Sequence, residues 1–340
     1  MIGNINKQMD FNSIAVEKLV DKNHSYRKIN EMIKFDKLIE PLQSIYSKNG
    51  APGEPLERGF KALLLQHWEN LSYRQLARYV KENIPARWFC GYALDEETPD
   101  HSYYCKLRDR IGLKKLSELF NEIICVLEKA GYVGNVFHFV DASSLMSKVN
   151  LWDARDKAIA DSENKTVDKD TEKPLMNNSN VSKYSSDPDA RFGCKGKKNF
   201  WFGYKRHVRV DMRQGFITKT TVTSAEVPDC QAFISEKMCP DSGMVFMDKG
   251  YDTDEVDKEI VKKNCASGTI KKNNRKNKNK RLDNWRTSVR MPYENVFKGL
   301  PKYTRLRGKT KIIIQNIYES LVYNFKRLIR VNVKAVPIFQ

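Results

Sequence analysis

The pattern of apolar and polar positions divides the chain into a helical first part and a mixed second part. Up to about residue 130, apolar residues recur every three or four positions, as in 57–67 and 114–130, which predicts amphipathic helices. Ser72 and Gln75 form a capping-box pattern that predicts another helix start. A later helix is expected to stop at Gly112. This part of the chain therefore predicts an all-helical domain.

From about residue 135 the pattern changes to short strands. The run 136–140 is apolar and rich in β-forming residues, which predicts a buried strand. Further on, two strands joined by a turn predict a hairpin. The remaining expected elements are helices at 229–238 and 253–263, strands at 244–247 and 268–270, and an amphipathic helix near the C-terminus. This order predicts an α/β fold with a mixed sheet.

We therefore expect two domains, a helical DNA-binding domain over 1–130 and a catalytic domain over 131–335. The catalytic domain contains a polar stretch at about 150–190 with few aromatic residues, which predicts a mobile insertion or linker. It also contains a basic loop at about 262–281. In the helical domain, the pattern fits either a DNA-binding helix-turn-helix or an ordinary helical bundle.

Charge and composition point to a nucleic-acid partner. The 340 residues carry a formal net charge of +18, with a pI near 9.4, and 40% are hydrophobic, so the charge belongs to a folded protein. A soluble protein that is simply rich in lysine remains the alternative. The seven cysteines form no CxxC pair, which predicts reduced thiols in a cytoplasmic protein. No apolar run is long enough to predict a membrane span, and no secretory signal is present.

Three acids are the candidate catalytic residues. Asp141 and Asp248 each follow an apolar strand, and carboxylates that meet at one sheet edge repel each other unless a cation lies between them. Oxygen ligands favour Mg²⁺ or Mn²⁺. Glu294 begins an apolar-periodic segment that fits a helix, and it is the candidate third acid. Asp211 is a rival that lies at a hairpin turn, Glu255 is a second candidate for the third acid, and each aspartate also fits a local capping role.

Several segments carry a resemblance to a known family. The segments 140–143 (VDAS), 202–207 (FGYKRH) and 247–252 (MDKGYD), with 187–192 (DPDARF), resemble the core of DDE transposases from bacterial insertion sequences. The most similar group is the fifth insertion-sequence family, which is related to the fourth. The helical part resembles the same family through 71–76 (LSYRQL), and the resemblance covers roughly residues 30–330.

The resemblance implies a ribonuclease-H-like catalytic core. Asp141, Asp248 and Glu294 would bind Mg²⁺ or Mn²⁺, cleave the ends of an insertion element and transfer them into target DNA. The implied partners are double-stranded terminal repeats and target DNA, a second copy of the chain in a synaptic complex, and no membrane. The implied location is the bacterial cytoplasm, at the nucleoid. The alternatives are a non-catalytic DNA-binding protein derived from a transposase and a stand-alone metal-dependent nuclease.

Basic residues near these segments are the candidate DNA contacts. Arg290 stands four residues before Glu294, as the family pattern asks, whereas Thr287 replaces its tyrosine and Lys302 lies one place beyond its lysine position. The run 262–281 contains no acid, so it fits either a solvated loop or a clamp on the DNA backbone. The residues assigned to DNA are Lys106, Arg108, Arg110, Lys205, Lys249, Lys271, Lys272, Arg275, Lys276, Arg290 and Lys302.

Overall fold

A computed structural model describes Gly3 and residues 11–46, 53–163, 178–196, 199–276 and 278–331. The chain forms two compact units. The helical unit comprises Met1–Gly134, Arg213–Phe216 and Ile317–Gln340, and the sheet unit comprises Asn135–Met212 and Ile217–Asn316.

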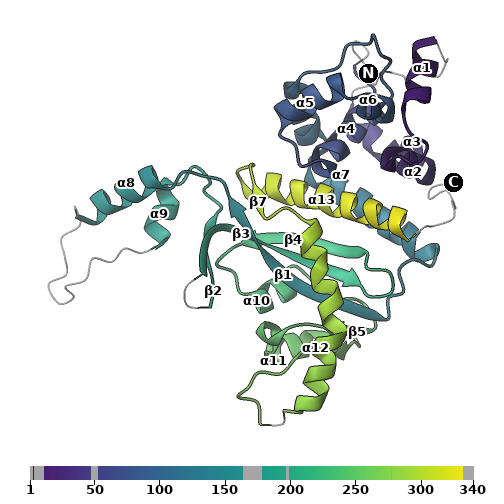
Figure 1. The fold of residues 1–340 in the computed structure, drawn as a ribbon. Coiled ribbons are helices and arrows are strands. Elements are labelled where there is room, and N and C mark those ends of the chain that lie inside the picture. The colour runs from purple at the N-terminus through teal and green to yellow at the C-terminus, as the bar shows by residue number, and fades with distance from the viewer. Residues whose placement is uncertain are drawn as a thin grey trace. The chain divides into compact units, whose positions relative to one another are not determined.

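The helical unit consists of helices packed around an apolar core. Its elements in chain order are α1 (Phe11–Leu19), α2 (Ser25–Met32), α3 (Phe35–Leu38), η1 (Glu40–Ile45), α4 (Leu56–Trp68), α5 (Tyr73–Glu82), α6 (Ile84–Cys90), α7 (His101–Lys129) and the later part of α13 (Lys309–Arg330) (Figure 1). Helix α4 is buried over most of its length, and Phe60 of α4 packs against Tyr318 of α13. The expected helical architecture is confirmed for the described residues among the first 130.

Two local predictions in this unit are also confirmed. Ser72 caps α5 and Gln75 returns a hydrogen bond to the Ser72 backbone, which is the expected capping box. Within α7, Gly112 has φ 68°, a left-handed conformation that interrupts the helix at the position where the sequence predicts a stop.

The sheet unit is built on one mixed sheet. Its strands are β1 (Phe137–Ser147), β2 (Arg191–Lys195), β3 (Asn199–Asp211), β4 (Ile217–Ser224), β5 (Met244–Phe246), β6 (Ala266–Ser267) and β7 (Tyr303–Thr304). The main order is β4-β3-β1-β5-β6, with β2 beside β3 and β7 beside β1. Strand β3 runs antiparallel to β1 and β4, whereas β1, β5 and β6 are parallel. This arrangement is that of a ribonuclease-H-like core, as expected.

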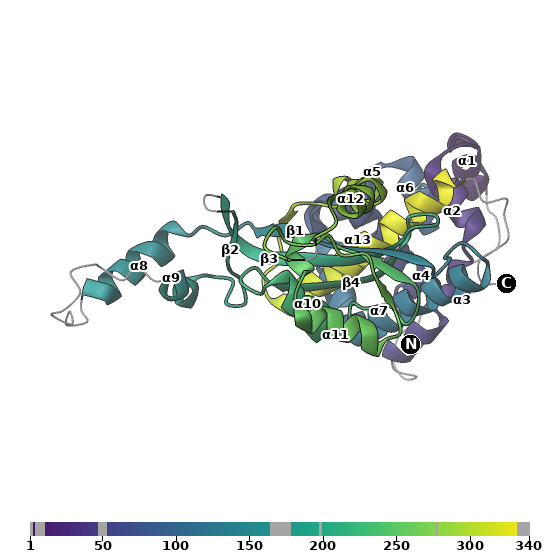
Figure 2. The ribbon, with the colours of Figure 1, turned by 90° about the horizontal axis from the view of Figure 1, so that it is seen from below.

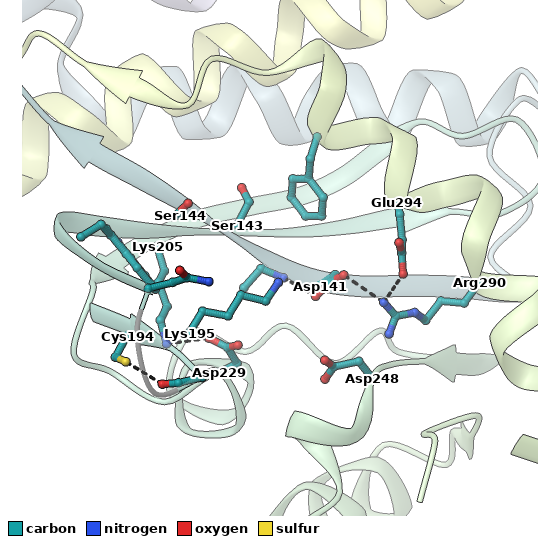
Figure 3. Close-up of a pocket in the computed structure, with 15 residues that line it drawn as sticks. Asp141, Ser143, Ser144, Cys194, Lys195, Lys205, Asp229, Asp248, Arg290 and Glu294 are labelled. Atoms are coloured by element: carbon teal, nitrogen blue, oxygen red, sulfur yellow. Dashed lines mark hydrogen bonds and ion pairs between the residues drawn. The ribbon is translucent and has the colours of Figure 1, made fainter. Parts of the chain in front are cut away.

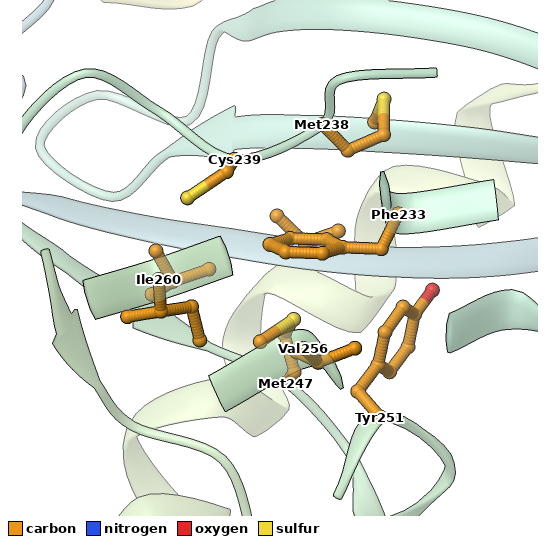
Figure 4. Close-up of a cluster of buried hydrophobic side chains, with 9 residues drawn as sticks. Phe233, Met238, Cys239, Met247, Tyr251, Val256 and Ile260 are labelled. Carbon is orange, nitrogen blue, oxygen red and sulfur yellow. The ribbon is translucent and has the colours of Figure 1, made fainter. Parts of the chain in front are cut away.

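Helices complete the sheet unit. They are α8 (Trp152–Glu163), α9 (Asn178–Tyr184), α10 (Asp229–Ser235), η2 (Lys249–Tyr251), α11 (Asp254–Lys262), α12 (Lys280–Glu294), η3 (Asn295–Gly299) and the first part of α13. One core cluster joins α10, η2 and α11 to the sheet through Val140, Phe233, Tyr251 and Val256 (Figure 4). A second cluster around Leu145, Tyr204 and Ile312 joins the sheet to α13. These two clusters hold the strand ends at fixed positions.

Two predictions for this unit are corrected. The stretch 150–190 is partly helical, because Ala154 and Ala158 of α8 pack against Val181 of α9 in a small apolar cluster. Both helices extend away from the rest of the sheet (Figures 1 and 2), and residues 164–177 of the stretch lie outside the described residues. Glu294 ends α12 instead of beginning a helix.

Candidate active site

Asp141 and Asp248 come from neighbouring parallel strands. Asp141 lies within β1 and not after its strand as expected, because β1 continues to Ser147. Asp248 follows β5 as the N-cap of η2, where its Oδ1 accepts a hydrogen bond from the Gly250 N–H at 2.7 Å. Phe139 pairs with Phe246 in the β1–β5 register, so each aspartate lies two residues beyond a paired position. The two strands therefore carry both carboxylates to the same region of the sheet.

Helix α12 brings Glu294 to the same region through Arg290. The Arg290 guanidinium lies over the Phe139 ring at 5.6 Å, which fixes the helix against β1. Its Nη2 donates to Asp141 Oδ2 at 3.3 Å and forms a short ion pair with Glu294 Oε1 (Figure 3). Arg290 therefore bridges the first and third candidate acids.

One pocket of about 610 Å³ contains all three acids. A fourth carboxylate, Asp229 at the start of α10, lines it as well. Three cations, Lys195, Lys205 and Arg290, frame the acids. The complete lining is Asp141, Ala142, Ser143, Ser144, Cys194, Lys195, Gly196, Asn199, Trp201, Lys205, Asp229, Asp248, Arg290, Glu294 and Phe297. Asp211 and Glu255, the rival acids, do not line this pocket; Asp211 instead accepts a hydrogen bond from the Asn135 N–H at 3.1 Å.

The carboxyl of Asp141 is held in an unfavourable setting for its charge. Burial is the main cause that raises its pKa to about 7, and the negative charges of Asp248 and Asp229 add to this. The Arg290 guanidinium and the hydrogen bond from the Ala142 N–H act in the opposite direction. A bound cation would relieve this charge crowding.

The donor set fits a hard divalent cation in its chemistry. Asp141, Asp248 and Glu294 offer carboxylate oxygens, which Mg²⁺ and Mn²⁺ prefer. In the described part of the chain, however, no three Asp, Glu, His or Cys side chains are gathered closely enough to hold one metal ion. Arg290 pairs with both Asp141 and Glu294. The ion pair between Arg290 and Glu294 must therefore break before Glu294 and the two aspartates could bind the same metal ion.

Replacing Arg290 by glutamine is expected to destabilise the protein, and more so at higher pH. The change leaves the Asp141 charge without its cation in a mostly buried position. Because Arg290 lowers the pKa of Asp141, its loss raises that pKa above 7. Asp141 then takes up a proton, which limits the cost to about 1–2 kcal/mol at pH 8 and nearly removes it at pH 6. Denaturant unfolding without metal at pH 6 and pH 8 measures the difference. Arg78→Gln, which breaks an exposed pair with Glu82, is the control, and equal stability of Arg290→Gln and wild type at pH 8 would contradict this account.

The residues assigned to DNA fall into different settings. Lys205 and Arg290 line the pocket, and Lys249 follows Asp248 on the surface. Lys302 is exposed, and its backbone carbonyl accepts the Met146 N–H at the junction of β1 and β7. On α7 of the helical unit, Lys106 and Arg110 are exposed, and Arg110 covers the Tyr46 ring. Arg108 is buried and donates to Asp109 and Tyr73, so its assignment to DNA is not supported by its setting.

The basic loop is tied down by acids from an adjoining segment. Asp252 is fully buried and accepts Lys271 Nζ at 3.0 Å, the Lys272 N–H at 2.8 Å and Arg275 Nε at 3.1 Å. Lys271 also pairs with Asp257, and Arg275 with Asp254. Much of the charge at Lys271 and Arg275 is therefore neutralised, while Lys276 remains exposed.

Sequence reasoning missed several residues that shape this pocket. Asp229 follows Pro228 at a helix start, where an aspartate usually has a capping role, so nothing in the sequence marks it as an acid of the site. Lys195 of β2 and Trp201 of β3 also line the pocket, although neither was a candidate site residue. Of the aromatic residues at 200–204, Phe202 and Tyr204 are core residues, whereas Phe200 is exposed.

The fold and the pocket define a class of protein. A ribonuclease-H-like sheet with one acid in a strand, another just after the neighbouring parallel strand, and cations around both fits an enzyme that acts on phosphodiesters. Comparison with known families is consistent with this class. Residues 14–110 match a family described as transposase domain (DUF772), and residues 157–324 match the transposase DDE domain. Together these matches span well over half of the chain, which therefore belongs to the DDE transposases.

The matched regions divide the candidate acids. Asp248 and Glu294 lie within the DDE match, whereas Asp141 lies between the two matched regions. Among solved structures, the chain is similar to a piggyBac transposase described as a synaptic complex with hairpin DNA and determined by cryo-EM. The identity is 10%, the match covers 97% of this chain and 78% of that one, and the TM-score is 0.41. This likeness is too weak to bear on function.

No helix within the described residues has both the length and the apolar character that crossing a membrane requires.

Proposed function

We propose that the protein is an active transposase that cleaves the ends of an insertion element and joins them to target DNA. The observation that supports this most directly is the single pocket containing Asp141, Asp248 and Glu294 among lysine and arginine side chains. Phosphodiester transfer needs anions that hold a metal and cations that hold the DNA backbone, and this pocket offers both.

Each acid has a distinct part in the proposal. Asp141 and Asp248 are the metal ligands provided by the sheet, and Glu294 joins them once Arg290 turns to a DNA phosphate. Two Mg²⁺ or Mn²⁺ ions bound there would activate a water and neutralise the charge that develops on the phosphate. The chain positions the reacting groups, and Arg290 and Lys205 neutralise the backbone near them.

The finer identity also belongs to this proposal. We infer membership of the fifth insertion-sequence family from the segments 202–207 and 247–252. The helical domain over 1–130 would bind the terminal repeats, and the catalytic domain over 131–335 would carry the chemistry. Joining two ends needs two copies of the chain, so a homodimer is expected in the synaptic complex, acting on DNA at the nucleoid.

A cleavage and joining assay tests this function. Labelled duplexes that carry the ends of the protein's own element are incubated with the purified chain in Mg²⁺, Mn²⁺ or EDTA. The proposal predicts metal-dependent release of a 3′-hydroxyl end and its joining to a second duplex. Cleavage without joining of a supplied 3′-hydroxyl end would instead identify a stand-alone nuclease.

The second candidate is a DNA-binding protein that has lost catalysis. The observation that favours it is the Arg290 bridge, which leaves no three acid, histidine or cysteine side chains of the described residues arranged around one metal ion. This candidate predicts tight, salt-sensitive DNA binding with no cleavage in either metal.

A further inference from the structure

Lys205 is held by two acceptors at the edge of the pocket. Its ammonium donates to the Val227 carbonyl at 2.8 Å and lies 3.0 Å from Asp229 Oδ1, and its side chain is only 14% exposed. An ammonium carries three hydrogens. One of them is donated to the Val227 carbonyl, and the ion pair with Asp229 is not a hydrogen bond, so the ammonium keeps a donor for a ligand in the pocket that Lys205 lines.

Asp229 has an unsatisfied oxygen at the same place. Its Oδ1 is buried and has no hydrogen-bond donor, because the ion pair with Lys205 is not aligned as a hydrogen bond. A buried carboxylate oxygen without a donor is costly. The oxygen therefore needs a second donor to keep the carboxylate fixed.

Tyr251 provides an unsatisfied donor beside it. The Tyr251 side chain is fully buried, and its hydroxyl has no hydrogen-bond partner. Its ring packs edge-on against Phe233 of α10 at 6.1 Å (Figure 4). Asp229 and Phe233 are four residues apart on α10, so their side chains share one face of that helix.

The electrostatic surroundings agree with this placement. Burial raises the pKa of Tyr251 well above its usual range, and the next contribution comes from the negative charge of Asp229, ahead of Asp141 and Asp248. An unsatisfied donor and an unsatisfied acceptor thus lie within electrostatic reach of each other.

We propose that Asp229 and Tyr251 are positioning residues that aim the Lys205 ammonium at a phosphate of DNA bound in this pocket. Tyr251 donates to Asp229 when DNA is bound, Asp229 holds Lys205, and a remaining hydrogen of Lys205 reaches a phosphate oxygen. This inference rests on the proposed function for the existence of a DNA substrate, but it does not require that the substrate be cleaved.

Salt-dependent DNA binding tests the inference without catalysis. Affinity for a mixed-sequence duplex of about 30 base pairs is measured in EDTA between roughly 50 and 200 mM KCl. Lys205→Gln is expected to bind about tenfold more weakly than wild type, and its salt slope falls by about one, because one phosphate contact is lost. Lys258→Gln, an exposed lysine of α11 that does not line the pocket, is the matched control.

Asp229→Asn separates positioning from simple neutralisation. If Asp229 aims Lys205, Asp229→Asn lowers both DNA affinity and salt slope, as Lys205→Gln does. The double variant should then bind DNA only slightly more weakly than Asp229→Asn alone. If Asp229 only neutralises Lys205, Asp229→Asn binds DNA more tightly with a steeper slope, which overturns the proposal.

Tyr251→Phe tests the remaining contact. We expect Tyr251→Phe to lower DNA affinity and salt slope in the same direction as Asp229→Asn, but by a smaller amount. In the Asp229→Asn background, Tyr251→Phe should cause no further loss. The role of Tyr251 is overturned if Tyr251→Phe matches wild type in DNA affinity and salt slope. In that case the variant should also unfold at a higher temperature, because a buried hydroxyl without a hydrogen-bond partner has been removed. Because all these measurements exclude metal, they remain informative even if the protein proves unable to cleave DNA.

Discussion

Asparagine at position 141 is expected to abolish DNA cleavage and to stabilise the metal-free protein. The Asp141 side chain is 16% exposed against 50% for Glu294, and its loss removes several kcal/mol of charge stabilisation at the reacting phosphate. This corresponds to a rate at least about a thousandfold lower. DNA affinity in EDTA should be retained, because the cations of the pocket are unchanged.

The stability effect of this change depends on pH. The pKa of Asp141 is raised to about 7 in the folded protein, above its value in the unfolded chain. A raised carboxyl pKa stabilises the fold at low pH, and this contribution is lost as the pH rises from about 4 through 7. Above pH 7 the buried charge costs the fold up to about 4 kcal/mol, which Asp141→Asn recovers.

Thermal unfolding at pH 5 and pH 8 measures this effect. In EDTA, Asp141→Asn should melt above wild type at pH 8, with the difference reduced at pH 5. Mg²⁺ should raise the Tm of wild type at pH 8 and leave the variant unchanged. The exposed Asp241→Asn is the control, and a variant that is less stable than wild type at pH 8 would refute the charge-crowding account.

Alanine at position 252 is expected to be the most destabilising change outside the pocket. Burial alone would raise the pKa of Asp252, but hydrogen bonds from the Lys272 N–H, Lys271 and Arg275 hold it below its usual value. Removing this carboxylate leaves Lys271 and the Lys272 N–H without a buried acceptor, which costs about 3 kcal/mol. Because the pKa is lowered, the contribution of Asp252 to stability is lost as the pH falls below about 4.

The same change should release the basic loop. Limited trypsin digestion of Asp252→Ala should cut within 262–281 faster than in wild type, and denaturant unfolding gives the free-energy change. Asp254→Ala removes an exposed partner of Arg275 and should cost less than about 1 kcal/mol. Equal stability and equal digestion of the two variants would show that Asp252 does not anchor the loop.

Local patterns in the sequence were sufficient to predict the core of the fold. An apolar run followed by an acid predicted correctly that Asp248 follows a buried strand. The same pattern placed Asp141 after its strand, whereas β1 continues to Ser147 and Asp141 lies within it. Glu294 was placed correctly on a helix but at its wrong end. Glu294 is the last residue of α12, and Pro292 lies in the same last turn, where a missing N–H interrupts little.

The parts that the sequence did not predict depend on contacts between distant residues. Asp252 lies about twenty positions before Lys271 and Arg275 in the sequence. The run 262–281 was therefore predicted to be uniformly basic, although Asp252 pairs with both of these cations. Asp229 reaches the pocket only because α10 packs on η2 through Phe233 and Tyr251. The Arg290 bridge depends on how α12 crosses β1, and a pattern along one segment does not encode that crossing.

The most direct test of the account is strand transfer by Asp248→Ala beside wild type. Both proteins receive labelled element ends, target DNA and Mg²⁺, with Asp241→Ala as an exposed-acid control. The account predicts joined product with wild type and with the control, none with Asp248→Ala, and equal DNA binding by all three. Two results would contradict the assignment of this pocket as the active site of a transposase. One is joining by Asp248→Ala at the wild-type rate, and the other is no joined product with wild type in either Mg²⁺ or Mn²⁺.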